Sequence, residues 1–182
     1  MATRPEPGLG GHRLDAGVPD FSGAEGDDFE ALSRDRYPVR SLREDDLEAI
    51  VRIDAKLTGH DRSGYFKAKL REVMSETGVR VSLVAEVDGR PAGYVMARVD
   101  YGDFGRAEPG AVIDTIGVDP GLGHHGVGTA LLSQLLANLD SLHVERVQTR
   151  VTWNNLSLLG FLDRNGFVPA QQLVLAKVID PA

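Results

Sequence analysis

One short stretch carries the strongest chemical signal in this sequence. It reads Val118-Asp-Pro-Gly-Leu-Gly-His-His-Gly-Val-Gly-Thr and lies between an apolar segment and an amphipathic one. Glycine permits positive φ and close approach of a ligand to the backbone, and the first turn of a helix has unpaired N–H groups that bind anions. The stretch therefore predicts a cradle of main-chain amides for a phosphate group. Glycines that serve only the turn are the alternative.

Two common nucleotide-binding motifs fit this stretch poorly. Gly121, Gly123 and Gly126 match the spacing of the dinucleotide fingerprint, but an antiparallel hairpin precedes them and only 56 residues follow, too few for the usual parallel sheet. The Lys-Ser/Thr pair of a nucleoside-triphosphate loop is absent after the last glycine. A nicotinamide-dependent oxidoreductase is therefore a weaker hypothesis for the function of this protein.

Composition limits what such a site can serve. Hydrophobic residues make up 42% and charged residues 26% of the 182 residues, as in a single globular domain, and no apolar run is long enough to span a bilayer. A net charge of -7 disfavours a nucleic-acid partner. The absence of cysteine excludes disulfides, cysteine-bound zinc and a thiol nucleophile, and no metal site is expected. Without an apolar signal core, we expect a cytoplasmic protein.

The chain divides into a tail and a body. Residues 1–36 contain six glycines, three prolines and an excess of acids over arginines, and they show no sustained periodicity, so we expect a flexible acidic tail. Residues 37–182 show regular hydrophobic patterns and form the predicted domain. A regulatory or partner-binding role for the tail is the alternative to plain disorder.

The elements of the body alternate between strand and helix periodicity. Asp88-Gly89 marks a two-residue hairpin turn. We expect strands through Val39 and Leu42, at Val81–Val87, Ala92–Val99, Ala111–Val118, Val144–Val151 and over most of Phe167–Ile179, and helices from about Leu47, at Arg62–Glu76, from Val127 to Leu139 and at Asn155–Arg164. The order predicts a mixed α/β fold of the α+β type.

The chain resembles the GNAT N-acetyltransferase superfamily. Its acetyl-CoA signature is Gln/Arg-x-x-Gly-x-Gly/Ala, for which this sequence has Gly123-His-His-Gly126-Val-Gly128. Asn155 stands eleven residues before Gly166-Phe167, as in the family's late Asn-helix-Gly-Phe segment. The resemblance covers roughly Val39 to Ile179. The first signature position, Gly123, departs from the family's Gln or Arg.

The resemblance implies a mostly antiparallel sheet that is splayed open between its fourth and fifth strands, Ala111–Val118 and Val144–Val151. The implied cosubstrate is acetyl-CoA, whose pantetheine arm would pair with backbone groups of the fourth strand and whose pyrophosphate would bind the glycine turn. Asn155 would contact it near the thioester. The implied cofactor-binding residues are Ile116, Gly117, Val118, Gly123, His124, His125, Gly126, Val127, Gly128, Thr129 and Asn155. His124 and His125 either add positive charge near the phosphates or are solvated loop residues.

The implied reaction is transfer of an acetyl group to a primary amine by direct attack, with no acyl-enzyme. The acceptor would be a protein lysine, a protein N-terminus or a small amine, and neither nucleic acid nor a membrane is expected as partner. A non-catalytic acyl-CoA-binding regulatory module is the second hypothesis. It is favoured by the loss of the family's general-acid tyrosine, because that position is Leu162.

A base must remove a proton from the ammonium before it can attack. Asp114 is our candidate, because a carboxylate within Val112-Ile-Asp-Thr-Ile needs an explanation and some relatives place a basic residue at the matching position. We expect it to share a strand face with Ile116. A salt-bridged or solvent-facing residue is the alternative. The reserve candidates for the base are Glu86, Asp54 and His60. A separate group must protonate the thiolate of CoA, and the candidates for this acid are water, Ser157 and Tyr101.

Two further features bear on the acceptor pocket and on assembly. Trp153, Tyr65, Phe66 and Tyr94 either line the pocket or belong to the core. After Gly166-Phe167 the family usually has two strands, yet about thirteen residues remain up to Ile179. A partner chain that covers this edge, and hence a homodimer, is our hypothesis.

Overall fold

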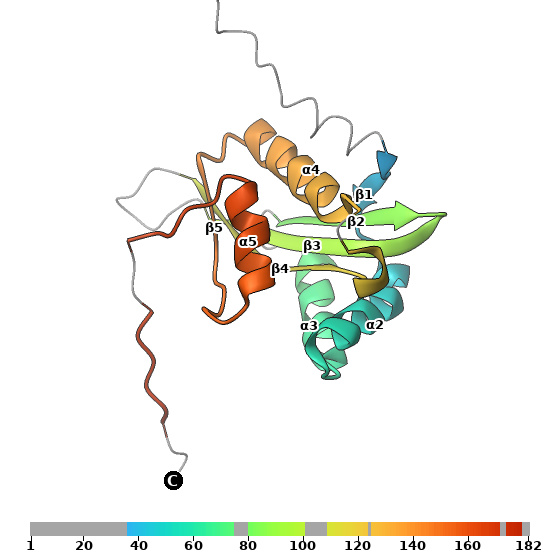
Figure 1. The fold of residues 1–182 in the computed structure, drawn as a ribbon, viewed down its shortest axis with the longest axis horizontal. Helices are drawn as coiled ribbons and strands as arrows, with labels where there is room; N and C mark the ends of the chain where they lie inside the picture. Colours follow the sequence, from blue (N-terminus) through green and yellow to red (C-terminus); the bar gives the residue numbers. More distant parts are fainter. Residues whose placement is uncertain (1–35, 75–79, 101–108, 124, 172–173, 180–182) are drawn as a thin grey trace, which may run out of the picture.

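The computed structural model describes residues 36–74, 80–100, 109–123, 125–171 and 174–179. A five-stranded sheet runs through the centre in the order β1-β2-β3-β4-β5 (Figure 1). The strands are β1 (Val39–Ser41), β2 (Arg80–Val87), β3 (Arg90–Asp100), β4 (Gly110–Val118) and β5 (Arg146–Thr149). The first four pair antiparallel, whereas β4 and β5 pair parallel. The predicted mixed, mostly antiparallel sheet is confirmed.

The hairpin between β2 and β3 forms as predicted. Asp88 and Gly89 both have positive φ, 52° and 71°, which are the values of a type I′ turn that matches the twist of the paired strands.

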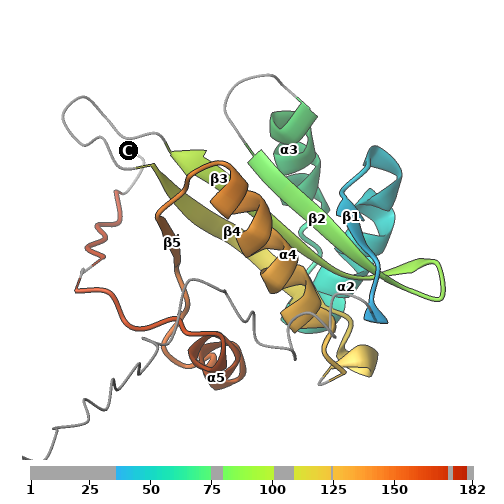
Figure 2. The ribbon, with the colours of Figure 1, turned by 90° about the horizontal axis from the view of Figure 1, so that it is seen from above.

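The helices form two layers, one on each face of the sheet. They are α2 (Leu47–Thr58), α3 (Ser63–Met74), α4 (Val127–Ser141) and α5 (Leu156–Arg164), with short 3-10 turns η1 (Glu44–Asp46) and η2 (Pro120–Leu122). Helices α2 and α3 lie on one face and α4 on the other, while α5 stands beside β5 (Figure 2). No helix in the described part of the chain is long and apolar enough to cross a membrane.

Each face has its own buried cluster. Leu131, Leu135 and Leu139 of α4 are at most 1% exposed and pack against alternate residues of β2, β3 and β4. On the opposite face, Ile50 and Ile53 of α2 pack with Phe66 of α3. These spacings of three and four residues produce the apolar stripes read from the sequence.

A β-bulge interrupts the pairing of β3 with β4. Met96 pairs with Thr115 but Ala97 pairs with Ile113, so Asp114 is the extra residue. An extra residue reverses the alternation of side chains beyond it. Ile113 and Ile116 therefore both pack on the α4 side, while Asp114 faces α3. The expectation that Asp114 shares a face with Ile116 is wrong for this reason.

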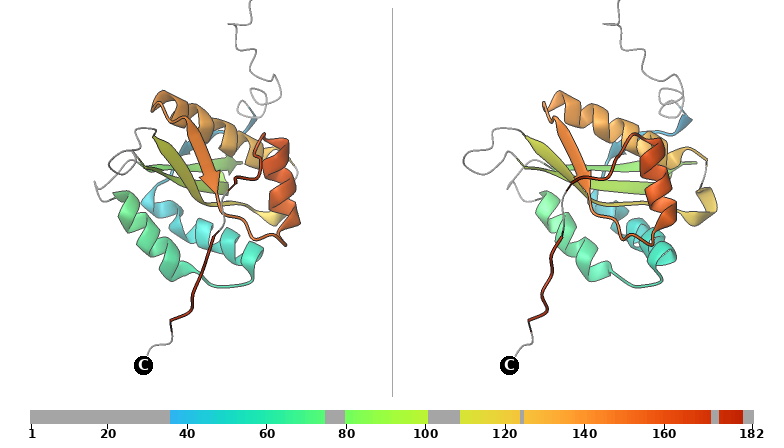
Figure 3. Two further views of the ribbon diagram at one scale, coloured as in Figure 1. Left: turned by 90° about the vertical axis from the view of Figure 1, so that its left-hand side faces the viewer. Right: turned by 60° about the vertical axis from the view of Figure 1, so that its left-hand side comes forward.

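Two predictions on the C-terminal side are corrected. Strand β5 covers only Arg146–Thr149 of the expected Val144–Val151. Described residues 167–171 and 174–179 form no strand, and the last segment runs away from the body (Figure 3). A strand needs a ladder partner, which this segment lacks among the described residues, and Pro169 has no N–H to donate.

Candidate active site

The sheet opens between β4 and β5. Their pairing ends at Ile113 opposite Thr149, where the Thr149 hydroxyl donates to the Ile113 carbonyl at 3.1 Å. Strand β4 continues to Val118. Its last residues, which include the predicted Ile116, Gly117 and Val118, therefore present a stretch of backbone along which β5 no longer runs.

The glycine turn leads directly from this open strand into α4. Gly126 is the N-cap and has φ of 92°, a left-handed conformation that strains any residue with a Cβ. The first intrahelical bond joins the Ala130 N–H to the Gly126 carbonyl at 2.9 Å. Within the described residues, no side chain caps this helix. The amides of Val127, Gly128 and Thr129 lie in this first turn, whose N–H groups have no partner within a helix, so they stay the predicted donors to a phosphate group.

Close packing explains two of the glycines. A Cβ on Gly128 would lie 3.2 Å from the Phe161 ring of α5, and a Cβ on Gly117 would lie 2.9 Å from both Leu57 and the Tyr94 ring. At these distances a Cβ would force its neighbours to shift. The predicted site residues Gly117 and Gly128 thus also allow α2 and α5 to approach the opening.

An ion pair that sequence reasoning missed fixes the turn before α4. The Asp119 carboxylate accepts from the Gly121 N–H at 3.0 Å and from Lys56 Nζ of α2 at 2.7 Å. The Lys56 ammonium, with the Gly121 amide, holds the pKa of Asp119 below its usual range. Lys56 and Asp119 are 63 residues apart, so no local pattern signals this contact.

The remaining predicted residues of the turn differ in their availability. The Gly123 N–H donates to the Pro120 carbonyl at 3.4 Å, so this amide already has a partner. His125 is exposed, and His124 lies outside the described residues. No group of three potential metal-binding side chains occurs in the described part of the chain.

Asn155 is the N-cap of α5. Its side-chain oxygen accepts from the Leu158 N–H at 3.2 Å, and the side chain is exposed. Capping accounts for an asparagine at this position without a ligand. Leu162, the position of the family's general acid, is 5% exposed. Of the two hydroxyl residues considered as alternative proton donors to the thiolate, Ser157 is exposed and Tyr101 lies outside the described residues.

Asp114 follows Ile113, the last residue of β4 that pairs with β5, and so lies where the opening begins. Its side chain is 11% exposed and accepts hydrogen bonds from Arg98 and, at 3.2 Å, from Lys69 Nζ of α3. Two cations therefore neutralise the carboxylate. This is the salt-bridged arrangement considered as the alternative, brought to the opening by the bulge.

Two of the three reserve bases are paired with arginines. Asp54 is 2% exposed and accepts from Arg62, at 2.8 Å from Nε, and from the Tyr94 hydroxyl at 3.0 Å. Glu86 accepts from Arg40 at 2.7 Å. Burial and the Asp54 carboxylate raise the pKa of Tyr94. The third reserve base, His60, is exposed.

The aromatic candidates divide between core and surface. Phe66 and Tyr94 are at most 1% exposed and stack edge to face at 5.5 Å, so they belong to the core. Trp153 is 86% exposed. Tyr65 is half-buried beside Phe66.

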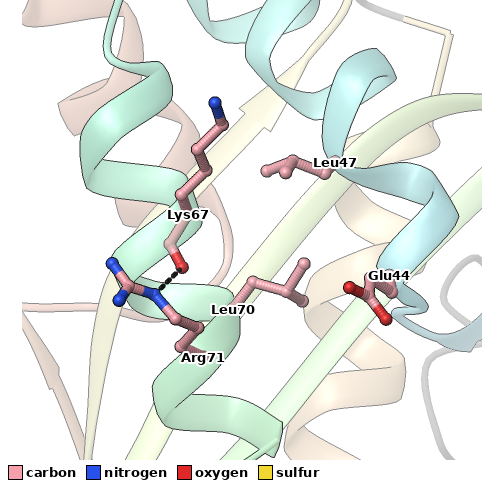
Figure 4. Close-up of a pocket in the computed structure, with 5 residues that line it drawn as sticks. All are labelled: Glu44, Leu47, Lys67, Leu70 and Arg71. Carbon is pink, nitrogen blue, oxygen red and sulfur yellow. Dashed lines mark hydrogen bonds between the residues drawn. The ribbon is translucent and has the colours of Figure 1, made fainter.

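A groove of about 460 Å³ separates the start of α2 from α3 (Figure 4). Leu47 and Leu70 form its apolar part, and charged side chains surround them. The Arg71 side chain folds back onto its own helix, where Nε donates to the Lys67 carbonyl at 3.3 Å.

Comparison with known proteins identifies this arrangement. Residues 36–167 match the Acetyltransferase (GNAT) family. The chain belongs to the GNAT acetyltransferase family. The match covers the sheet, the glycine turn and α5, so the resemblance read from the sequence is confirmed.

Solved structures share the GNAT fold at low sequence identity. AAC(6')-Iy in complex with the bisubstrate analogue CoA-S-monomethyl-acetylneamine superposes with a TM-score of 0.66 and 16% identity, covering 79% of this chain and 99% of the other. Glucosamine-6-phosphate N-acetyltransferase from Arabidopsis thaliana gives 0.61 and 17%, with 79% and 99% covered. A transcriptional regulator from Bacillus halodurans C-125 gives 0.67 and 16%, with the same coverage.

Proposed function

We propose that this GNAT protein transfers an acetyl group from acetyl-CoA to a primary amine. The observation that carries the proposal is the open first turn of α4, which stands directly beyond the stretch of β4 that β5 leaves uncovered. Acetyl-CoA is the cosubstrate in keeping with membership of the GNAT family. Neighbours of the same fold include enzymes named for aminoglycosides and for glucosamine 6-phosphate, which supports a small amine as acceptor.

We assign the cosubstrate-binding groups as follows. The amides of Val127, Gly128 and Thr129 would bind the pyrophosphate, and the Ile116–Val118 backbone would pair with the pantetheine arm. Main-chain donors suit this task because they need no side chain at the first signature position, where this protein has Gly123. Asn155 stays a candidate contact near the thioester, in addition to its capping role.

The acceptor nitrogen would attack the thioester carbonyl carbon directly. The ammonium first gives up one proton to the base. The new C–N bond then replaces the C–S bond, the nitrogen loses a second proton, and the thiolate of CoA takes one up. Asp114 stays our candidate for the proton acceptor because it lies where the opening begins and faces α3. The resemblance to the GNAT family implies that the amine enters on this side, against the early helices. Lys69 and Arg98 would orient it.

A regulatory acyl-CoA-binding module is the second candidate function. The buried Leu162 favours it, because a tyrosine hydroxyl is absent where many relatives have their general acid. A neighbour named as a transcriptional regulator has the same fold. A cytoplasmic location stays a prediction for either function.

Two measurements, calorimetry of cofactor binding and an assay of CoA release, separate these functions. We expect calorimetry to detect binding of CoA. We expect an assay of CoA release to detect turnover of acetyl-CoA with at least one amine from a panel. The panel comprises peptides with a free N-terminus, lysine peptides, polyamines and aminosugars. Binding without turnover across the panel would favour the regulatory module. Heat with NADH and none with CoA would favour the oxidoreductase and overturn the assignment of the glycine turn.

A further inference from the structure

Arg62 is an exposed cation whose guanidinium is held from behind by a buried acid. The residue directly precedes α3, and its carbonyl accepts from the Phe66 N–H at 3.1 Å in the first turn. Its Nε donates to one oxygen of Asp54 at 2.8 Å, and its Nη2 pairs with the other oxygen. The side chain of Asp54 is 3% exposed, whereas that of Arg62 is 40% exposed. The pair therefore fixes one edge of the guanidinium and leaves another part of it open to solvent.

Two aromatic rings hold the same guanidinium from a second direction. Its central carbon lies 5.3 Å from the centre of the Tyr65 ring and 5.6 Å from the centre of the Phe66 ring, distances typical of cation–π contacts. Phe66 is itself buried in the core. An arginine held in this way loses little conformational freedom when a ligand binds, which favours affinity.

The guanidinium has N–H groups that are free to bind a ligand. An arginine side chain carries five, and Asp54 accepts two of them, so three remain. No other residue in the described part of the chain accepts from this side chain. The neighbouring carboxylate of Asp61 is turned to the start of α3, where it accepts from the Ser63 N–H at 2.8 Å. Guanidinium N–H groups match the paired oxygens of a carboxylate or phosphate.

The Asp54–Arg62 pair lies close to the open part of β4. The Tyr94 hydroxyl donates to Asp54 at 3.0 Å, and a Cβ on Gly117 would lie 2.9 Å from the Tyr94 ring. One side chain, that of Tyr94, thus separates the pair from the strand to which we assign the pantetheine arm. The pair lies on the α2 and α3 side of the sheet, which is the side expected for the amine.

We propose that the acceptor of this protein is a primary amine that also carries a carboxylate or phosphate group, and that Arg62 binds this anionic group. The inference rests on the proposed acetyl transfer and adds the class of its acceptor. Charge-assisted hydrogen bonds to Arg62 would hold the acceptor at one end while its amine reaches the thioester beside β4. An acceptor with several positive charges, such as a polyamine, would meet a like charge at this position.

Matched pairs of amines test the preference for an anion. The kcat/KM of CoA release is compared between each amino acid of a panel and its carboxamide, and between phosphoethanolamine and ethanolamine. We expect the anionic member of at least one pair to be favoured about tenfold to a hundredfold. The pair that shows this preference tells a carboxylate from a phosphate. Arg62→Gln should bring the ratio close to one, and Arg62→Lys, which keeps a charge beside Asp54 but lacks the planar fork, should lower it severalfold.

The change in this ratio between wild type and variant is the decisive quantity. It cancels the difference in amine pKa between an acid and its carboxamide. The matched control is Lys67→Gln, which removes an exposed cation from the same helix and should leave the ratio unchanged. Circular dichroism shows whether each variant folds. Equal rates for both members of every pair, or a preference that stays unchanged in the folded Arg62 variants, would overturn the proposal.

Calorimetry separates this proposal from the proposed function. The same amines are titrated into protein saturated with CoA, where no transfer occurs. We expect tighter binding of the anionic member, and loss of this difference in Arg62→Gln. A binding preference without turnover of any amine would support the arginine site and overturn the acetyl transfer. Turnover with no preference for the anion in either measurement would support the acetyl transfer and overturn the arginine site.

Discussion

Asp46 is a buried carboxylate held by one arginine. Its side chain is 4% exposed and accepts from both terminal nitrogens of Arg40, at 2.7 and 2.8 Å, and from the Arg43 N–H at 2.8 Å. The Arg40 guanidinium, with the Arg43 amide, holds the pKa of Asp46 below its ordinary value despite burial. This contact joins β1 to η1 and thereby fixes the start of the α2 layer.

The lowered pKa predicts a pH-dependent contribution to stability. The charged carboxylate stabilises the fold above the unfolded pKa of about 4, and this contribution is lost as the pH falls through the lower folded value. We expect Asp46→Asn to reduce the free energy of unfolding by about 2–3 kcal/mol at neutral pH. The difference from wild type should shrink as the pH falls below about 4 in urea titrations. Asp45→Asn, at the exposed neighbour, should have little effect at either pH.

A second prediction at the residue scale concerns Asp114. If its carboxylate accepts the proton of the amine, Asp114→Asn should lower kcat by about a hundredfold or more while leaving the affinity for CoA unchanged. Steady-state kinetics and calorimetry on the same preparation check the two quantities. Unchanged kcat would assign Asp114 to the ion pairs with Lys69 and Arg98 alone. Asp61→Asn, at an exposed loop carboxylate, is the control.

The turn between β4 and α4 is the element to which we assign cosubstrate binding. Gly126 is the N-cap of α4 and takes φ of 92°, and no described side chain caps the first-turn amides of this helix. We expect Gly126→Ala to cost about 1–2 kcal/mol of stability, because its Cβ disfavours this conformation, and to weaken CoA binding. Thermal unfolding and calorimetry measure the two effects.

Gly121→Ala is the matched control in the same turn. A Cβ there would lie 3.5 Å from the Asp119 carboxylate, an ordinary contact, and Gly121 is not among the described residues with positive φ. We therefore expect near wild-type stability and affinity. Equal losses in both variants would contradict the assigned role of Gly126.

At the scale of the whole molecule, we predict a folded unit that begins at residue 37, after the acidic tail. The two described buried clusters draw all their members from Tyr37 and later residues, and the family match begins at residue 36. We expect a chain of residues 36–182 to keep the unfolding midpoint and the CoA affinity of the full chain. A loss of either would assign a structural or binding role to the acidic tail, and differential scanning calorimetry would detect it.

Features set by neighbouring residues could be predicted from the sequence. The hairpin at Asp88-Gly89, the stripe of leucines in α4 and the glycine turn at Gly126 each depend on local conformational preferences or on a local period. Strand β5 and the expected C-terminal strand were less predictable, because a β-prone segment becomes a strand only where a partner is available.

Local preferences therefore determined most of the elements, their order and the glycine turn at the start of α4. Tertiary structure alone decided that Asp114 is the bulged residue facing Lys69, that Asp54 lies buried between Arg62 and Tyr94, and that Lys56 holds Asp119. These contacts join residues between 8 and 63 positions apart. Their energies depend on burial and on distances across the fold, which residue type and spacing do not encode.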